Sequence, residues 1–268
     1  MKKEEILAAL KDIENLELEI EARLIESIQP VHDKKTNLEL TSGRVTETIQ
    51  AMADQIVADK SISNPVLISI MDGAFPFASA LQAELIKRNY RFEYTTMQAT
   101  SYAGTKSGEL SIQAHPKTIV AGRNVIVLDE VCDTGKTYAA ILKKLKQQGA
   151  NDVRLAVLVD KAQFRLTKTS NPYYRGFVVS KNAFIIGSGL DFKGLVRNLQ
   201  FIGAVDQDKL PTENEWTLLN RKVALSKALI ECNAADTIGR QFKLFKSKPA
   251  PSIANPLDFE HETRMKLL

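Results

Sequence analysis

The stretch that decides the fold reads VIVLDEVCDTGKT and runs from Val125 to Thr137. Its apolar start predicts a buried strand that ends at Leu128. Asp129 and Glu130 follow at the carboxyl end of that strand, which is where open α/β sheets bind their ligands. Residues 133–137, DTGKT, then lead directly into a predicted helix.

The start of this helix predicts a phosphate site. A glycine between two threonines offers hydroxyl donors, backbone N–H groups and the positive end of the helix dipole. The two acids before it do not favour phosphate, but they suit the hydroxyls of a sugar or a metal ion beside it.

Two other interpretations of the stretch have to be weighed. A nucleotide-binding P-loop needs a glycine five positions before Gly135, and that position holds Glu130, whose charge would repel phosphates. The remaining structural alternative is a capped helix that follows a strand, with both acids solvated.

Helical and strand-like patterns alternate on both sides of this stretch. We therefore predict an α/β fold, a doubly wound parallel sheet of about five strands. The expected strands are Val66–Met71, Phe92–Ala99, Asn124–Leu128 and Val153–Val159, with shorter ones at Gly176–Val179, Ala183–Ile186 and Phe201–Val205. The expected helices lie around Val45–Ile56, at Phe75–Arg88 and at Lys136–Gln148.

Helical extensions are expected at both ends of the chain. Apolar residues spaced by three or four over residues 1–29 predict an amphipathic helix, which packs either on its own domain or on a partner. Thr212 with Glu215 forms a capping box before a second helix, and the Lys- and Pro-rich chain beyond Gly239 predicts an extended arm or a partly disordered tail. The predicted divisions are residues 1–39, 40–206 and 207–268.

Composition excludes several classes of protein. The 268 residues carry 36 basic and 32 acidic side chains, too mild an excess to indicate a nucleic-acid binder. Two cysteines and three scattered histidines support neither a disulfide framework nor a zinc site. The acidic N-terminus does not read as a secretory signal, and no membrane-spanning run is present, so we expect a cytoplasmic protein.

With these residues in place, the chain from about Arg44 to Val205 resembles the type I phosphoribosyltransferases, and most closely their hypoxanthine-guanine branch. VIVLDEVCDTGKT is similar to the motif that binds phosphoribosyl pyrophosphate (PRPP). MDGAFPF, Met71 to Phe77, resembles the pyrophosphate loop, and TSYAGTKSGE, Thr100 to Glu109, resembles the mobile loop. DKAQFR and FIIGSGLDF, at 160–165 and 184–192, resemble the purine elements.

The resemblance implies a role for each matching residue. Asp133 is the expected general acid/base at N7 of the purine. The ribose and 5-phosphate of PRPP are expected at Asp129, Glu130, Thr134, Gly135, Lys136 and Thr137. Pyrophosphate is expected at Asp72, Gly73 and Arg197, and the mobile loop carries Ser101 and Tyr102. The purine is expected at Lys161, Phe184, Ile185 and Asp191, and magnesium at Asp129, Glu130 and Asp191. Three of these purine residues also have a plain alternative: Lys161 as a solvated lysine, Phe184 as a core side chain and Asp191 as a turn residue.

The implied activity is purine salvage: transfer of ribose 5-phosphate from PRPP to hypoxanthine or guanine, with release of pyrophosphate and use of Mg²⁺. The alternative is a PRPP-sensing regulator on the same fold, or an enzyme for another base. The fold would include a small hood, built from both sequence ends of the core and including the strands near residues 176–205. The protein would form a homodimer or homotetramer and would bind neither nucleic acid nor a membrane. The sequence departs from the branch at Asp72, where lysine is usual, and in the order of Asp129 and Glu130.

Overall fold

The structure is a computed structural model that describes residues 2–101, 110–114, 119–166, 172–179, 184–192 and 195–247. Its helices are α1 (Lys3–Glu26), α2 (Ser42–Ala58), α3 (Phe75–Lys87), α4 (Lys136–Gln147) and α5 (Glu213–Ser247), with short 3₁₀ turns at Ala162–Phe164 and Gln207–Lys209. Its strands are β1 (Gln29–Pro30), β2 (Val66–Met71), β3 (Glu93–Ser101), β4 (Leu110–Ala114), β5 (Asn124–Cys132), β6 (Asp152–Asp160), β7 (Tyr174–Val178), β8 (Phe184–Ile186) and β9 (Gly203–Val205).

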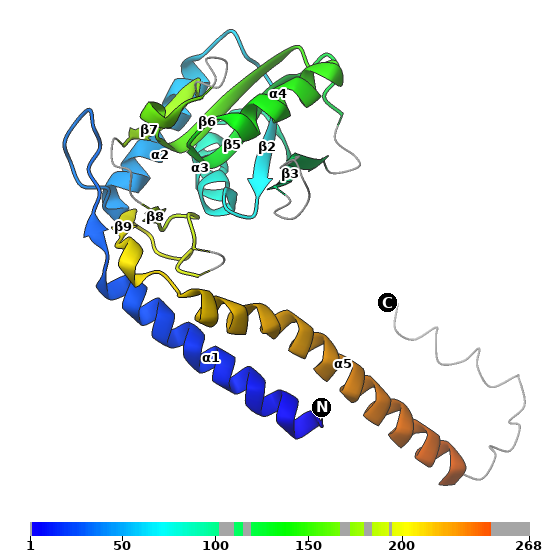
Figure 1. The fold of residues 1–268 in the computed structure, drawn as a ribbon. Helices are drawn as coiled ribbons and strands as arrows, with labels where there is room; N and C mark the ends of the chain where they lie inside the picture. The colour runs from blue at the N-terminus through cyan, green and yellow to red at the C-terminus, as the bar shows by residue number, and fades with distance from the viewer. Residues whose placement is uncertain are drawn as a thin grey trace, which may run out of the picture. The chain divides into compact units, whose positions relative to one another are not determined.

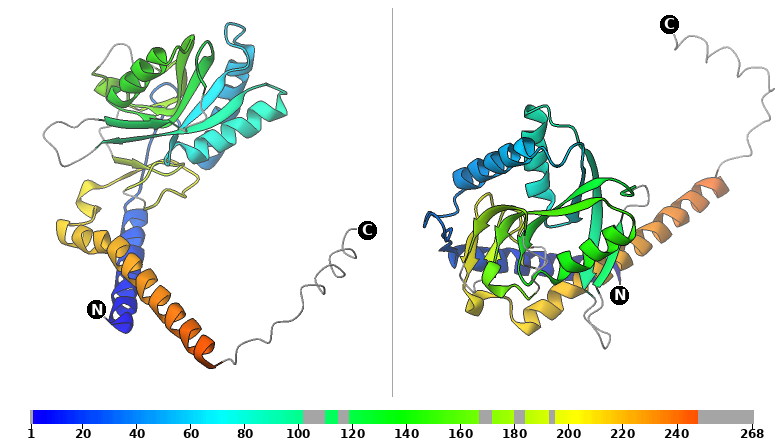
Figure 2. Two further views of the ribbon diagram at one scale, coloured as in Figure 1. Left: turned by 90° about the vertical axis from the view of Figure 1, so that its right-hand side faces the viewer. Right: turned by 90° about the horizontal axis from the view of Figure 1, so that it is seen from above.

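Six of these strands form the main sheet, in the order β4-β3-β2-β5-β6-β7 (Figures 1 and 2). Strands β3, β2, β5, β6 and β7 run parallel to one another, and β4 pairs antiparallel with β3 at one edge. Helices α2 and α3 cover one face, while α4 covers the other. This is the doubly wound α/β arrangement predicted from the alternation of strands and helices.

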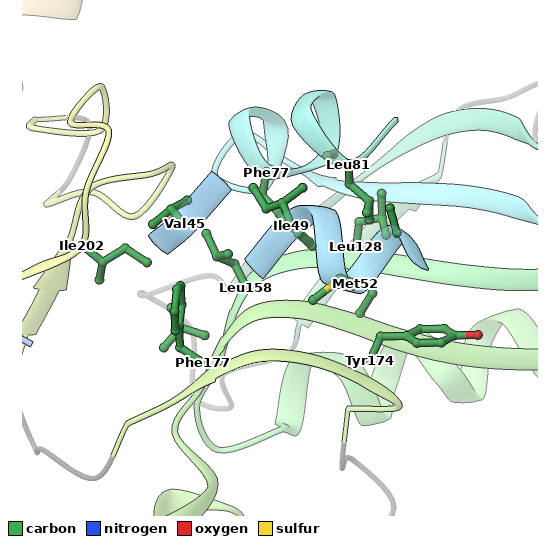
Figure 3. Packing of buried hydrophobic residues seen from close by; sticks show 14 of the residues in the cluster. Val45, Ile49, Met52, Phe77, Leu81, Leu128, Leu158, Tyr174, Phe177 and Ile202 are labelled. Atoms are coloured by element: carbon green, nitrogen blue, oxygen red, sulfur yellow. The ribbon is translucent and has the colours of Figure 1, made fainter. Parts of the chain in front are cut away.

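The central strand β5 is buried on both faces, as its unbroken apolar run predicts. Ile126 and Leu128 point into the cluster beneath α2 and α3, while Val125 and Val127 point into the cluster beneath α4. Figure 3 shows the first cluster, in which side chains of α2 and α3 pack onto the sheet. Because successive side chains of a strand face opposite ways, one apolar run supplies both cores.

A second, three-stranded antiparallel sheet forms the hood, in the order β1-β9-β8. It combines a segment near residue 30 with segments near residues 185 and 204. Ile202, beside β9, reaches the core cluster that Figure 3 shows. The sequence predicted a hood but grouped β7 with it. That part of the prediction was wrong, because β7 pairs in parallel with β6 and closes the main sheet.

Two further predictions are corrected. β5 does not end at Leu128 but continues to Cys132, because its ladder with β6 extends to the pair Cys132–Asp160. The chain beyond Gly239 was expected to be an extended arm, yet α5 continues to Ser247. A single interior glycine weakens a helix by only about 1 kcal/mol, and the first proline stands at position 249.

The described chain divides into two compact units, residues up to Glu17 with those from Pro211 onward, and residues Leu18–Leu210. In the first unit, Ile6 and Ile13 of α1 and Leu219 and Leu225 of α5 are buried. The Thr212–Glu215 capping box forms as predicted, with Thr212 N 2.7 Å from Glu215 Oε2. None of the described helices is both long and apolar enough to span a bilayer. The three-part division at residues 39 and 206 stays a prediction.

Candidate functional site

The carboxyl ends of β2 and β5 open onto a cavity of about 370 Å³. The sequence marked this edge of the sheet as the place for a ligand. Ten of the predicted site residues line the cavity: Asp72, Gly73, Asp129, Glu130, Asp133, Thr134, Gly135, Thr137, Asp191 and Arg197. The fold thus brings together residues that lie as far as 125 positions apart in the chain.

One wall is the turn between β5 and α4. Gly135 caps the helix with a left-handed backbone, φ 80°, which a residue with a side chain adopts only at a cost. Thr134 Oγ1 accepts a hydrogen bond from Lys136 N at 3.4 Å, and Lys136 itself is exposed. The turn therefore presents the start of α4 to the cavity, the arrangement that binds anionic groups.

The acid pair lies at the end of β5. Glu130 N donates to Asp129 Oδ1 at 3.1 Å. Both side chains keep some contact with the cavity, but surrounding protein atoms desolvate them. Burial, and then the charge of Glu130, raises the pKa of Asp129, and burial raises the pKa of Glu130. Such carboxylates favour a cationic or hydroxyl-bearing ligand that offsets their desolvation.

Two glycines let three segments meet beside this pair. A Cβ at Gly73, in the loop after β2, would lie 2.1 Å from Glu130 Oε1. A Cβ at Gly189, in the hood loop, would lie 2.2 Å from Gly73 O. The peptide bond before Asp72 is cis. Glycine at positions 73 and 189 is therefore needed for the close approach of the acid pair, the β2 loop and the hood loop.

Arginine supplies the positive charge in the cavity wall. Arg197 Nη2 lies 2.8 Å from Asp191 Oδ2, and its Nη1 donates to Gly189 O at 3.0 Å. Both Asp191 and Arg197 were predicted as ligand contacts. In this structure they contact each other, which orients the guanidinium over the hood loop at the edge of the cavity.

Of the predicted purine residues, Asp191 lines the cavity, whereas Lys161, Phe184 and Ile185 are not among the described residues of its wall. Lys161 Nζ is 3.9 Å from Asp133 Oδ2, and its side chain is 12% exposed. Phe184 packs edge-on against Phe192, with ring centroids 5.2 Å apart. Ile185 is buried and pairs with Ala204 in the hood sheet. Asp133 in the cavity wall thus has the ammonium group of Lys161 as a neighbour.

Two predicted residues cannot be placed in the site, and two residues that were not predicted line the cavity. The side chain of Ser101 and the whole of Tyr102 lie outside the described residues. Cys132 and Tyr138 also line the cavity, although the sequence did not single them out. Cys132 ends the strand and Tyr138 lies in the first turn of α4, so the strand–turn–helix geometry itself was the signal. Burial raises the pKa of the Cys132 thiol to about 11.

Magnesium binds through oxygen ligands, which the cavity wall and the substrate have to supply. Among the described residues, no cluster of three or more histidine, cysteine or acidic side chains could enclose a metal ion. The cavity wall nevertheless carries five carboxylates, including the desolvated pair at 129 and 130. Mg²⁺ usually binds through one or two carboxylates together with substrate oxygens and water. The residues fit magnesium that arrives with a phosphorylated substrate.

Most of the region that lines the cavity matches a known protein family. The family model described as "phosphoribosyl transferase domain" matches residues 39–193. The chain is similar to a hypoxanthine-guanine phosphoribosyltransferase of Streptococcus pneumoniae, with 31% identity over 167 residues, 61% of this chain and 89% of that protein.

Solved structures share the fold. A hypoxanthine-guanine phosphoribosyltransferase from Bacillus anthracis aligns with TM-score 0.57 and 24% identity, over 67% of this chain and 99% of that one. A Trypanosoma cruzi hypoxanthine phosphoribosyl transferase, studied for the role of its C-terminal region in oligomeric state and activity, aligns with TM-score 0.58 and 24% identity, over 63% and 90%. The chain therefore belongs to the phosphoribosyltransferase family, as its PRPP-type motif predicted.

Proposed function

We propose that this protein transfers ribose 5-phosphate from PRPP to a 6-oxopurine, hypoxanthine or guanine, and releases pyrophosphate. The observation that carries the proposal is that Asp133, which lines the cavity with the helix-start turn and the acid pair, has Lys161 Nζ 3.9 Å from its carboxylate. The naming of the S. pneumoniae relative as a hypoxanthine-guanine enzyme supports the same acceptor.

In this proposal different parts of the site bind different parts of the two substrates. The 5-phosphate binds at residues 134–137, and the ribose hydroxyls bind at Asp129 and Glu130. Lys161 donates to the 6-oxo group of the purine, and Phe184 lies against its ring. A 6-oxopurine rather than adenine follows from Lys161, because an ammonium donates to an oxo group but has no lone pair to accept from an amino group.

The reaction breaks the bond from the anomeric carbon to pyrophosphate and forms a bond from that carbon to a purine nitrogen. Asp133 takes the proton that the purine gives up, a role worth about 10²- to 10⁴-fold for a well-placed base. Arg197 stabilises the negative charge that develops on pyrophosphate. Magnesium, held at Asp129, Glu130 and Asp191 with the substrate, would supply further charge neutralisation on pyrophosphate.

A base screen tests the proposal. The purified protein is incubated with PRPP and Mg²⁺ and with hypoxanthine, guanine, xanthine, adenine, uracil or orotate, and pyrophosphate release is followed. We expect turnover with hypoxanthine or guanine, and we expect Asp133→Asn to lower kcat by about 10²- to 10⁴-fold with little change in PRPP affinity. PRPP binding without consumption of any oxopurine would instead support a regulator or another acceptor.

We also propose that the protein assembles as a homodimer or homotetramer. Apolar side chains are exposed on both extension helices: Leu7 of α1 is 47% exposed, and Val223 and Ile230 of α5 are 64% and 67% exposed. The T. cruzi study concerns a link between a C-terminal region and oligomeric state, which supports a similar role for α5. The cytoplasmic location expected from the sequence stays a prediction.

A further inference from the structure

The segment that follows β6 lies against the turn between β5 and α4 along three consecutive carbonyl groups. Residues 161–166 donate one hydrogen bond to the carbonyl of each of residues 132, 133 and 134. The distances are 2.9 Å from Lys161 N to Cys132 O, 2.9 Å from Arg165 Nη1 to Asp133 O and 3.0 Å from Leu166 N to Thr134 O. We call residues 161–166 the brace segment.

These contacts set the orientation of the turn. In a trans peptide unit the C=O and N–H bonds point in opposite directions. Carbonyls of residues 132–134 that face the brace segment therefore direct the N–H groups of residues 133–135 away from it. The turn then offers its donors to a ligand rather than to the protein, as a phosphate cradle requires.

The central contact comes from a side chain that is itself firmly held. Arg165 is 8% exposed, and its Nη2 pairs with Asp160, which is 1% exposed and ends β6. Asp160 is in register with Cys132 of β5, so the anchor belongs to the rigid sheet. Arg165 Nη1 also contacts Cys132 Sγ.

A buried ion pair of this kind is weak evidence for a role in stability, because apolar side chains of the same size pack as well without the cost of desolvation. What an apolar pair cannot supply is a donor to Asp133 O. Arg165 is not among the described residues that line the cavity, so its effect has to pass through the turn.

We propose that Arg165 is a positioning residue: anchored on Asp160, it fixes the Asp133–Gly135 turn in the shape that binds the 5-phosphate and holds Asp133 beside Lys161. The brace segment begins with Lys161, the residue assigned to the purine. The base side and the phosphate side of the cavity are thereby built as one unit. This inference rests on the proposed phosphoribosyl transfer.

The test compares Arg165→Gln with a matched control, Arg175→Gln. Arg175 of β7 pairs with the same carboxylate, Nη1 3.6 Å from Asp160 Oδ2, but is 42% exposed and is not among the described residues of the cavity wall. For Arg165→Gln we expect the KM and Kd of PRPP to rise about 10- to 100-fold, the effect of losing one charge-assisted hydrogen bond. The KM of the purine should rise as well, because Asp133 is no longer held beside Lys161, and Arg175→Gln should leave all three constants near wild type.

Hydrogen exchange of the amides of Lys161 and Leu166, which donate to the carbonyls of Cys132 and Thr134, gives a second readout that needs no activity. Exchange should accelerate in Arg165→Gln but not in Arg175→Gln. If Arg165→Gln fails to fold because Asp160 is left without its main partner, the double variant Asp160→Asn with Arg165→Gln removes that charge and is measured in the same way.

The outcomes separate the two proposals. If the wild-type protein neither binds PRPP nor consumes an oxopurine, the proposed function fails, while the exchange rates still report on the brace segment. If the wild-type protein is active and Arg165→Gln matches Arg175→Gln both in PRPP affinity and in the amide hydrogen exchange of Lys161 and Leu166, the positioning role of Arg165 is overturned.

Discussion

At the scale of single residues, Gly135 couples backbone conformation to ligand binding. Its φ of 80° lies in the left-handed region, where an L side chain costs about 1–2 kcal/mol. The turn can relieve that strain by changing shape, and such a change would misplace the donors at the start of α4.

We therefore predict that Gly135→Ala weakens PRPP binding roughly tenfold, as measured by calorimetry. The matched control is Gly122→Ala, because Gly122 also has a positive φ, 69°, and a Cβ there would meet nothing within 4 Å. It should lose a similar amount of stability and keep its PRPP affinity. Equal losses of PRPP affinity in the two variants would contradict a role for the turn.

The acid pair predicts a characteristic pH dependence. The pKa of Asp129 is raised in the folded state, first by burial and then by Glu130. Above pH about 4, where an unfolded aspartate ionises, the folded state therefore holds more protons than the unfolded state. Stability must then fall as the pH rises through the folded pKa.

Asp129→Asn removes this penalty and keeps the oxygen that accepts from Glu130 N. We expect its Tm without ligands to exceed that of the wild type at pH 7 by roughly 2–4 °C, the shift that about 1 kcal/mol makes in a protein of this size. The difference should vanish below pH 4 and shrink when Mg²⁺ and PRPP are present. Asp12→Asn, on the exposed surface of α1, controls for loss of a surface charge. A lower Tm for Asp129→Asn at pH 7 would show that the carboxylate does not destabilise the fold.

At the scale of elements, one arginine forms hydrogen bonds that connect three of them at the end of the sheet opposite the cavity. Arg154 of β6 donates to Asp59 after α2, Asp152 of β6, Tyr174 of β7 and the nearby Ser61. The pKa of Asp59 falls to about 2, chiefly because Ser61 donates to it. This network fixes the end of α2 against the sheet, and α2 carries much of the core in Figure 3.

We predict that Arg154→Met lowers the free energy of unfolding within the range of about 3–5 kcal/mol that removing one member of a buried ion pair costs, because the side chains of Arg154 and Asp59 are only 9% and 16% exposed. The lower end of that range is expected, because Asp152 is 45% exposed. Urea denaturation measures the change. Lys87→Met breaks a 2.6 Å ion pair of a lysine that is 67% exposed, and it should leave the urea midpoint nearly unchanged. A similar small effect for Arg154→Met would mean that water replaces its contacts.

At the scale of the whole molecule, we expect catalysis and subunit assembly to depend on different parts of the chain. The described residues that line the cavity all lie between Ile70 and Arg197, within the Leu18–Leu210 unit. A chain reduced to residues 18–210 should keep a kcat within a few-fold of the full chain. Its mass by light scattering should fall to that of a smaller assembly, because the exposed apolar residues of α5 are gone. An unchanged number of subunits would place the assembly contacts on the core instead.

The sequence by itself determined the parts of the protein whose signals are local. The bounds of β2, the strand–turn–helix around Gly135 and the acid pair follow from apolar runs, a glycine and hydroxyl residues that are adjacent in the chain. Together with the alternation of apolar strands and helices, these signals predicted the α/β class, the edge of the sheet that binds the ligand and six residues of the cavity wall, at positions 129, 130, 133, 134, 135 and 137. The other four, Asp72, Gly73, Asp191 and Arg197, came from the resemblance to a known family.

Tertiary structure decided whatever depends on pairing between distant segments. β5 runs on to Cys132 because β6 continues to pair with it, and the hood forms because β9 lies between β1 and β8. The contacts of Gly73 with Glu130 and of Arg165 with Asp133 join residues 57 and 32 positions apart. Local periodicity reports which face of an element is apolar, but a close approach or a buried hydrogen bond exists only once the chain has closed around it.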